Sequence, residues 1–375
     1  MIDIHPVDTR SKSDVRRFLH LPFRLYEGNA LWVPPILLDA STQLNPNKHP
    51  FYEHSDAEFF LAVRNGEDVG RIALLENKVY NRYHDKRQVQ FYLFECIEDY
   101  EVAEALFGRA HDWARGRGLT QIVGPKGFGA LDGYGMLVKG FEHRPAMTMM
   151  NYNPPFYPQF MKRLGFKKEV DFISHYMNAD DFRLSDRIHR IAQRAARRSG
   201  LQVLRFKNKK ELLSWAPKIG RTYNNSFINN WEYYPLSSNE IDFLTKNIMD
   251  VADPKLMKII VHEGEVVGFL FAFPDVSAGI QRAKGRLLPF GIIHMLREMK
   301  RTKWVAINGA GILPEFQGRG GNALLYSEME NTIREAEFQH ADLTQVAESA
   351  VQMRRDLVNI GGVPYKNHRV FIKDV

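Results

Sequence analysis

Residues 304–338 hold the pattern that constrains this chain most: a β-rich stretch, a glycine-rich turn and a helix in direct succession. The β-rich stretch begins Trp304-Val305-Ala306-Ile307 and continues to Pro314. The turn reads Gln317-Gly318-Arg319-Gly320-Gly321-Asn322. After the turn, apolar residues recur at helical spacing, at Leu325, Met329, Ile333 and Ala336. The sequence therefore predicts a strand that leads through a glycine turn into a helix.

A turn of this kind suits a phosphate group. The first N–H groups of a helix lack partners within the helix, and the helix dipole makes that end positive. Gly318, Gly320 and Gly321 let the backbone approach a diphosphate closely, and Arg319 adds a fixed positive charge. The turn is not a Walker A loop, because no Gly-Lys-Ser/Thr follows. The glycines also fit a loose dinucleotide-binding fingerprint, but that motif needs a βαβ unit, and the surrounding hairpins argue against one. The other alternative is a simple turn without a ligand.

The chain reads as two halves with the same order of elements. Each half contains a hairpin signal, Asn65-Gly66 in the first and Glu263-Gly264 in the second. In the first half we expect strands at 2–7, 59–63, 69–75, 89–97, 120–123 and 172–177, and helices at 13–25, 101–117 and 157–164. In the second half we expect strands at 202–206, 256–262, 266–273, 303–312, 342–346 and 365–372, and helices at 209–215, 238–248, 320–338 and 351–360. Residues 32–47 are rich in Pro and Asn and predict an ordered loop or lid.

These elements predict two domains, residues 1–178 and 201–375, joined by a basic helical linker at 179–200. Arg190, Arg194 and Arg197 fall on one face of the linker helix. That pattern is typical of a solvated connecting helix, and it also suits a surface that binds anions.

Composition narrows the possible partners and the compartment. The net charge of +7 suggests an anionic partner, although a mildly basic protein without one has the same composition. The single cysteine, Cys96, excludes an internal disulfide and a cysteine-based metal site, so no metal is expected. No stretch approaches the roughly 18 apolar residues of a membrane span, and no signal peptide is recognisable. We expect a cytoplasmic protein.

The glycine turn resembles the coenzyme A motif of the GNAT superfamily of N-acyltransferases, Gln/Arg-x-x-Gly-x-Gly/Ala. Gln317 and Gly320 occupy the first and fourth positions of that motif, and Leu313-Pro314 and Leu324-Leu325 match its usual flanks. Asn322 is a departure, since glycine or alanine is usual there. The resemblance covers about residues 201–375 and implies an α/β (α+β) fold. It implies two GNAT-like domains in tandem, each with a mixed, mostly antiparallel sheet and helices on both faces.

The resemblance also implies a cofactor and a set of residues that bind it. The co-substrate is acyl-CoA or acetyl-CoA, and its pantetheine arm lies along the splayed strand as a pseudo-strand. The expected binding residues are Ile312, Leu313, Gln317, Gly318, Arg319, Gly320, Gly321, Asn322 and Ser349. Whether the carrier is coenzyme A or an acyl carrier protein stays open.

The first half resembles the same fold without the cofactor turn. Glu98-Asp99-Tyr100-Glu101 stands where the motif should be, and an acidic helix start repels a diphosphate. We therefore expect this half to shape the acceptor site. The whole chain is similar to a bacterial subgroup of tandem acyltransferases associated with lipid and envelope metabolism, including bacterial ceramide synthases. The similarity runs through Leu31-Trp32-Val33-Pro34-Pro35, Gly70-Arg71-Ile72 and the stretch from Gly124-Pro125 to Gly140-Phe141.

Two residues are candidates for proton transfer. Making an amide from a thioester requires a deprotonated amine and a proton for the leaving thiolate. Glu348 follows the strand at 342–346 and is the candidate base; the alternative is a carboxylate that favours a helix N-terminus. In this superfamily the acid is often a Tyr on the closing helix, but Leu357 or Val358 stands there, so Tyr365 is the expected substitute.

The acceptor side is marked by three segments. Residues 224–235 are polar and aromatic, and residues 127–135 contain four glycines, which suits a ligand or a long ordered turn. Residues 284–301 combine apolar side chains, among them Ile292, Met295, Leu296 and Met299, with five cations. This inserted segment is typical of a helix on an anionic membrane surface, and equally of a packed surface helix.

The sequence thus predicts an acyl-CoA-dependent N-acyltransferase with a small-molecule or lipid amine as acceptor, such as a long-chain, sphingoid-like amine. The alternatives are an acetyltransferase of a small soluble amine or amino acid, and a non-catalytic module that binds acyl-CoA. We expect no nucleic acid partner, because no stacking platform or recognised motif accompanies the Arg face. Peripheral contact with the inner face of the membrane is expected through 284–301.

Overall fold

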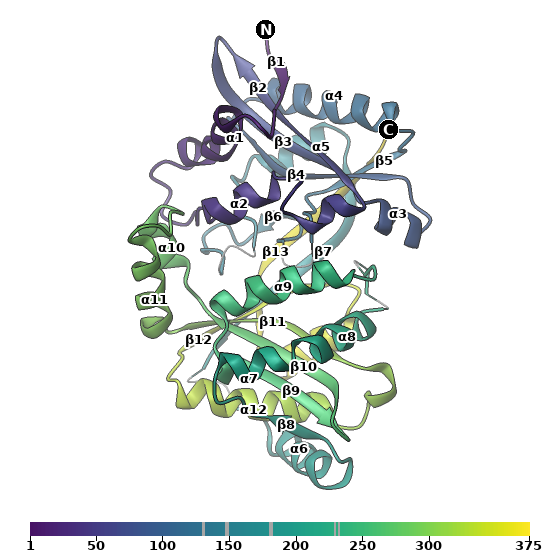
Figure 1. The fold of residues 1–375 in the computed structure, drawn as a ribbon, viewed down its shortest axis with the longest axis vertical. Coiled ribbons are helices and arrows are strands. Elements are labelled where there is room, and N and C mark those ends of the chain that lie inside the picture. Colours follow the sequence, from purple (N-terminus) through teal and green to yellow (C-terminus); the bar gives the residue numbers. More distant parts are fainter. Residues whose placement is uncertain (130–131, 147–149, 180–182, 229, 232) are drawn as a thin grey trace. The chain divides into compact units, whose positions relative to one another are not determined.

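The computed structural model describes residues 1–129, 132–146, 150–179, 183–228, 230–231 and 233–375 (Figure 1). The chain divides into two compact units that are interleaved in sequence. Unit 1 consists of residues 1–173, 276–298 and 366–375, and unit 2 of residues 174–275 and 299–365. Each unit thus contains residues from both halves of the sequence.

Unit 1 is built on a mixed sheet with strand order β1-β2-β3-β4-β5-β13, and β6 pairs with β13. Its strands are β1 (Asp3–Pro6), β2 (Asp56–Arg64), β3 (Glu67–Glu76), β4 (Gln88–Cys96), β5 (Gln121–Gly124), β6 (Met136–Lys139), the first part of β7 (Lys167–Asn178) and most of β13 (Val363–Asp374). All neighbours from β1 to β4 are antiparallel, β4 and β5 are parallel, and β5 and β13 are antiparallel.

Helices cover both faces of the unit 1 sheet. Because successive side chains of a strand point to opposite faces, each strand packs against helices on both sides. On β2, Phe60 and Ala62 pack into the core with α4, whereas Phe59 and Leu61 pack into the core with α1. The helices of this unit are α1 (Lys12–Leu25), α2 (Leu37–Gln43), α3 (Lys78–Tyr83), α4 (Tyr100–Gly116), α5 (Tyr157–Arg163), α10 (Ser277–Ala283) and α11 (Gly291–Arg301), with η1 (Pro50–Glu53) as a 3₁₀ turn. The last residues of α11 fall in unit 2.

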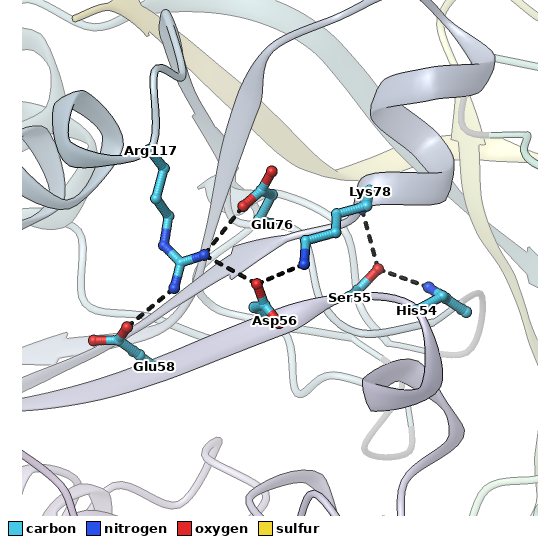
Figure 2. A network of polar contacts seen from close by, with 7 residues as sticks. All are labelled: His54, Ser55, Asp56, Glu58, Glu76, Lys78 and Arg117. Carbon is cyan, nitrogen blue, oxygen red and sulfur yellow. Dashed lines mark hydrogen bonds and ion pairs between the residues drawn. The ribbon is translucent and has the colours of Figure 1, made fainter.

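A network of charged side chains holds α3 and α4 to the β2–β3 hairpin (Figure 2). Arg117 follows α4 and donates to Asp56 at 3.0 Å, to Glu58 at 3.2 Å and to Glu76 at 3.3 Å. Lys78, at the start of α3, pairs with Asp56 at 2.8 Å. Because these side chains are partly exposed, the network serves mainly to fix where the two helices meet the sheet.

Unit 2 repeats this plan. Its sheet has the order β12-β11-β10-β9-β8, with β7 beside β12. Its strands are β8 (Gln202–Leu204), β9 (Met257–His262), β10 (Glu265–Pro274), β11 (Trp304–Ile312) and β12 (His340–Ala347). Its helices are α6 (Asp186–Arg198), α7 (Lys209–Ser214), α8 (Ala216–Ser226), α9 (Ser238–Val251), α12 (Gly321–Glu335) and α13 (Val351–Asn359), with 3₁₀ turns η2 (Pro254–Leu256) and η3 (Pro314–Phe316). As in unit 1, one central pair of strands, β11 and β12, is parallel.

The two units share local details as well as strand order. Both hairpins turn on a pair of residues with positive φ, Asn65-Gly66 and Glu263-Gly264, as the sequence predicts. Each central strand carries a bulge at a residue with positive φ, Leu93 in β4 and Gly309 in β11. Both bulges lie five residues after the start of the strand. The predicted fold class, two related mixed α/β units, is confirmed.

Several expected elements differ in the structure. The predicted loop over 32–47 is wrong for α2, because Pro34 and Pro35 stand before this helix and Pro46 after it, so no proline interrupts it. The short helices α3, α8 and α10 and the short strand β6 were not predicted. The expected linker, residues 179–200, contains α6, which packs on α12 within unit 2. Residues 180–182 of that segment lie outside the described residues.

Candidate functional site

The strands β11 and β12 run together and then diverge. Their parallel ladder extends from Trp304–His340 to Ile307–Leu343. Beyond that point β11 continues to Ile312 and β12 to Ala347. The bulge at Gly309, where φ is 97°, lies in the divergent part of β11. Two splayed strands present backbone donors and acceptors that an extended ligand can pair with, as a pantetheine arm requires.

The glycine turn connects this splayed strand to α12. The Leu313 N–H still donates to the Val267 carbonyl at 2.9 Å, and the Gln317 side chain donates to the Ile312 carbonyl at 3.2 Å. Gly318 and Gly320 then take left-handed backbone angles, with φ of 75° and 85°. Both positions therefore need glycine for conformational reasons. The Gln317 side chain thus joins the turn to the end of β11 by a hydrogen bond.

The start of α12 lacks a side-chain cap. Gly320 is the N-cap residue, and it has no side chain to accept from the first N–H groups. The equivalent helix of unit 1, α4, has an acidic N-cap: the Asp99 carboxylate accepts from the Glu101 N–H at 2.9 Å. The first N–H groups of α12 therefore have no side-chain cap, whereas α4 begins with a capping carboxylate.

One cation of the turn itself, and a basic helix that packs on the turn, lie at this site. Arg319 is exposed, and its guanidinium lies 4.8 Å from the centre of the Phe316 ring, which keeps the cation beside the turn. A Cβ at Gly320 would come within 3.0 Å of the Ala195 Cβ, so α6 packs directly on the turn. That helix carries Arg190, Arg194 and Arg197 as exposed side chains.

Asn322, the departure from the motif, does not disturb the turn. It is the second residue of α12, and its side chain is exposed. The tight packing falls on its neighbour Gly321, where an added Cβ would meet the Ile312 side chain at 2.8 Å. Gly321 is thus the position where a side chain would clash, while Asn322 is exposed to solvent.

The structure places the two predicted catalytic residues at different points of unit 2. Glu348 is half-buried in the turn that joins β12 to α13, and Ser349 is the exposed residue after it. Tyr365, near the start of β13, donates its hydroxyl proton to Asp342 at 2.5 Å. Burial and the neighbouring Asp342 carboxylate raise the pKa of Tyr365, so the phenol is a weaker acid than a free tyrosine.

A polar and aromatic cluster accompanies Tyr365. Asp342 is fully buried and lies opposite Ala306, one residue before the β11–β12 ladder ends. The Tyr176 hydroxyl lies 2.8 Å from the His340 Nδ1, and the Tyr176 ring is 6.0 Å from that of Tyr365. This cluster was not predicted from the sequence. Asp342, a carboxylate within an otherwise buried strand, could have indicated it.

Unit 1 fills the corresponding region with its own side chains. Glu95, two residues after the β4 bulge, occupies the place that Gly311 has after the β11 bulge. Its carboxylate accepts from Tyr26 at 2.8 Å and from Tyr157 at 2.9 Å. Burial raises the pKa of Glu95 to about 7, although the nearby Arg71 opposes the shift. A carboxylate held by two tyrosines thus stands in β4 where β11 has a glycine.

The segments expected on the acceptor side are held by their own internal bonds. Asp132 accepts from the Phe128 N–H at 2.6 Å, the Gly129 N–H at 3.0 Å and the Gln43 amide at 2.9 Å. Burial raises the pKa of Asp132 to about 6. This favours the ordered-turn interpretation of 127–135, of which residues 130 and 131 lie outside the described residues.

The second segment, 224–235, is likewise fixed at its base. The Asn224 side chain donates to the Leu236 carbonyl at 3.1 Å and accepts from the Leu236 N–H at 3.2 Å. Tyr234 donates to Glu240 at 3.2 Å. Residues 229 and 232 of the loop lie outside the described residues.

Within the described residues, no group of three or more His, Cys, Asp or Glu side chains is placed to hold a metal ion. The same part of the chain contains no helix that is both long and apolar enough to cross a membrane.

Comparison with known proteins places this geometry in a class. The chain matches, over its whole length, a tandem GNAT protein from the clavulanic acid biosynthesis pathway, with a TM-score of 0.58, 11% identity and 98% of that chain covered. A GCN5-related N-acetyltransferase from Sphaerobacter thermophilus matches with a TM-score of 0.52 and 12% identity, covering 100% of this chain and 95% of the other. No protein-family model matches the chain. The fold is that of a tandem GNAT protein, as the sequence predicts.

Two relatives are similar in sequence as well. A bacterial ceramide synthase from Caulobacter vibrioides is 29% identical over 381 residues, covering 99% of this chain and 97% of the relative. Protein YghO from Escherichia coli is 24% identical over 373 residues, with 97% and 94% covered. The chain thus has the fold of tandem GNAT proteins and is similar in sequence to a bacterial ceramide synthase, so the predicted resemblance is confirmed.

Proposed function

We propose that this chain is an N-acyltransferase that takes an acyl group from acyl-CoA, bound at the β11–α12 turn, and transfers it to an amine. The observation that carries this proposal is the contrast between the two units. Helix α12 starts at a left-handed glycine without a side-chain cap, while its counterpart α4 starts at the Asp99 carboxylate. An open helix start beside Arg319 suits a diphosphate, and the splayed β11 suits a pantetheine arm.

The reaction forms one C–N bond and breaks one C–S bond. The amine nitrogen attacks the thioester carbonyl, a base takes a proton from the nitrogen, and the departing thiolate takes up a proton. Two groups of unit 2 are candidates for the base. One is Glu348, in the turn after β12. The other is the Tyr365–Asp342 pair: the Tyr365 hydroxyl donates to Asp342, so its oxygen can take a proton from an amine as its own proton passes to Asp342.

A long-chain, sphingoid-like amine is the acceptor that we favour. The similar protein from Caulobacter vibrioides is a ceramide synthase, which supports a lipid amine. The inserted segment at α11 also exposes apolar side chains, among them Leu288 and Phe290. A protein that handles only small soluble amines has no evident need of such a surface.

The decisive experiment incubates the purified protein with acyl-CoA thioesters from acetyl to long-chain and with a panel of amines. We expect an amide with sphinganine, detected by mass spectrometry, together with release of free thiol. An amide only with small polar amines and acetyl-CoA would replace the lipid acceptor by a soluble one. Binding of coenzyme A without any amide would identify a non-catalytic binding module.

Three variants separate the two candidate bases. If Glu348 is the base, Glu348→Gln lowers kcat by roughly 10²–10⁴-fold, while Tyr365→Phe changes it little. If the Tyr365–Asp342 pair is the base, Tyr365→Phe and Asp342→Asn have the large effect. The dissociation constant for coenzyme A, measured by calorimetry, should stay constant in all three. The exposed Glu337→Gln is the matched control, and thermal melting checks that each variant is folded.

A further inference from the structure

The inserted segment that forms α10 and most of α11 is held within unit 1 over residues 276–298. A Cβ at Gly279 in α10 would lie 2.9 Å from the His294 carbonyl, and Met295 of α11 is buried against α10. The Leu37 N–H donates to the Gly285 carbonyl at 2.9 Å, and Gln281 donates to the Trp32 carbonyl at 2.9 Å. Helices α10 and α11 are therefore anchored to the segment that joins α1 to α2 (Figure 1).

This anchored segment nevertheless exposes large apolar side chains. Leu288 is 75% exposed, Phe290 71% and Leu296 49%. The described residues contain thirteen exposed large apolar side chains, and five of them lie within 288–296: Leu288, Phe290, Ile292, Ile293 and Leu296. Such clustering distinguishes a patch from the scattered apolar residues of an ordinary surface. We call residues 288–296 the α11 patch.

The unpaired charges of the segment that carries the α11 patch, residues 284–301, have one sign. Lys284, Arg286 and Arg297 are exposed beside it, and Lys300 and Arg301 are exposed in the last turn of the same helix. The one acidic residue of 284–301 is Glu298, and its carboxylate is paired with Arg282. The exposed charges that the segment 284–301 itself carries are therefore all cationic, which gives it charge complementarity to an anionic surface.

We propose that the α11 patch docks this protein on an anionic lipid surface. A helix that lies in the plane of a membrane buries its apolar side chains at the boundary between headgroups and acyl chains, while its cations bind lipid phosphates. The docking does not depend on the proposed reaction, although it would bring a lipid amine to the same protein.

Sedimentation with vesicles tests the proposal on the full chain without acyl donor or acceptor. We expect binding to phosphatidylcholine vesicles that contain phosphatidylglycerol, weak binding to pure phosphatidylcholine, and loss of binding as salt is raised. The double variant Leu288→Ser and Phe290→Ser should bind at least tenfold more weakly. Reversing Arg297 and Lys300 to Glu should weaken binding to anionic vesicles by at least tenfold and leave binding to neutral vesicles unchanged.

Helix α7 supplies matched controls on another surface. Leu213 is 50% exposed and Lys210 is exposed on the same helix, so Leu213→Ser and Lys210→Glu make the same chemical changes elsewhere. Both should bind vesicles as the unaltered protein does. Equal loss in patch and control variants would overturn the proposal, as would no binding to anionic vesicles at low salt. Light scattering that shows a dimer, which Phe290→Ser converts to a monomer, would indicate that a second copy covers the patch. This result would also overturn the proposal.

Discussion

At the scale of single residues, the glycine turn depends on backbone angles that only glycine adopts without strain. Gly318 and Gly264 form a matched pair in unit 2: φ is 75° and 81°, and neither would bring an added Cβ within 4 Å of another group. Changing either to Val should therefore cost similar stability, about 1–2 kcal/mol. Only Gly318→Val should weaken coenzyme A binding, by about tenfold or more, because one charge-assisted hydrogen bond contributes about 1.5–3 kcal/mol.

Calorimetric titration with coenzyme A checks this expectation. Gly318 is a better choice than Gly320 or Gly321, since a side chain at either of those would clash with α6 or with Ile312. Equal affinity of the Gly318 and Gly264 variants would remove the turn from the cofactor site.

Glu95 gives a prediction for pH. Its pKa in the fold is about 7, above the value of 4.5 for a free side chain, so the fold favours the protonated form. The stabilisation is complete below about pH 4.5 and is lost as pH rises through 7. The free energy of unfolding should fall by about 2–3 kcal/mol between pH 5 and pH 8 on this account. Glu95→Gln should remove that part of the slope, as measured by urea unfolding, whereas the exposed Glu27→Gln should not.

At the scale of elements, much of the arrangement could be predicted from local pattern. The two hairpins follow from Asn65-Gly66 and Glu263-Gly264, and the capping box at Ser237 and Glu240 does mark the start of α9. Short elements such as α2 and β6 were missed, because four to seven residues carry too little periodicity to separate helix or strand from loop. Helix α8 was missed although Pro217 stands in its first turn, where proline is tolerated.

The candidate site also has a part that local sequence predicts and a part that it does not. The glycine turn is local, so a continuous run of sequence is enough to predict it, and in the structure Gly318 and Gly320 have left-handed angles. The pairing of Tyr365 with Asp342 joins residues 23 apart on different strands, and that of Glu95 with Tyr26 joins residues 69 apart. Such contacts depend on sheet order, which a single sequence does not reveal. The assignment of Glu348 and Ser349 to the reaction stays a prediction.

At the scale of the whole molecule, the interleaving of the two units is the feature that sequence reasoning did not anticipate. Residues 366–375 complete the sheet of unit 1, where Phe371 lies opposite Gly124 of β5 and is buried. Phe371→Ala should therefore destabilise unit 1 by about 3–5 kcal/mol. Hydrogen exchange read by mass spectrometry should show lost protection in peptides from β4 and β5, while peptides from β9 and β10 keep theirs.

A control for this prediction is Val358→Ala, which alters an exposed side chain of α13 and should change exchange in neither unit. Loss of protection confined to unit 2 in the Phe371 variant would contradict the assignment of that strand.

The interleaving also has a consequence for biosynthesis. As the chain emerges from the ribosome, residues 1–173 hold most of unit 1, yet the edge of β5 that pairs with β13 has no partner until residues 366–374 have been made. An open strand edge is a template for pairing with other chains. A nascent or prematurely terminated polypeptide should thus be prone to aggregate at β5, and unit 1 should be the last part of the molecule to become resistant to proteases.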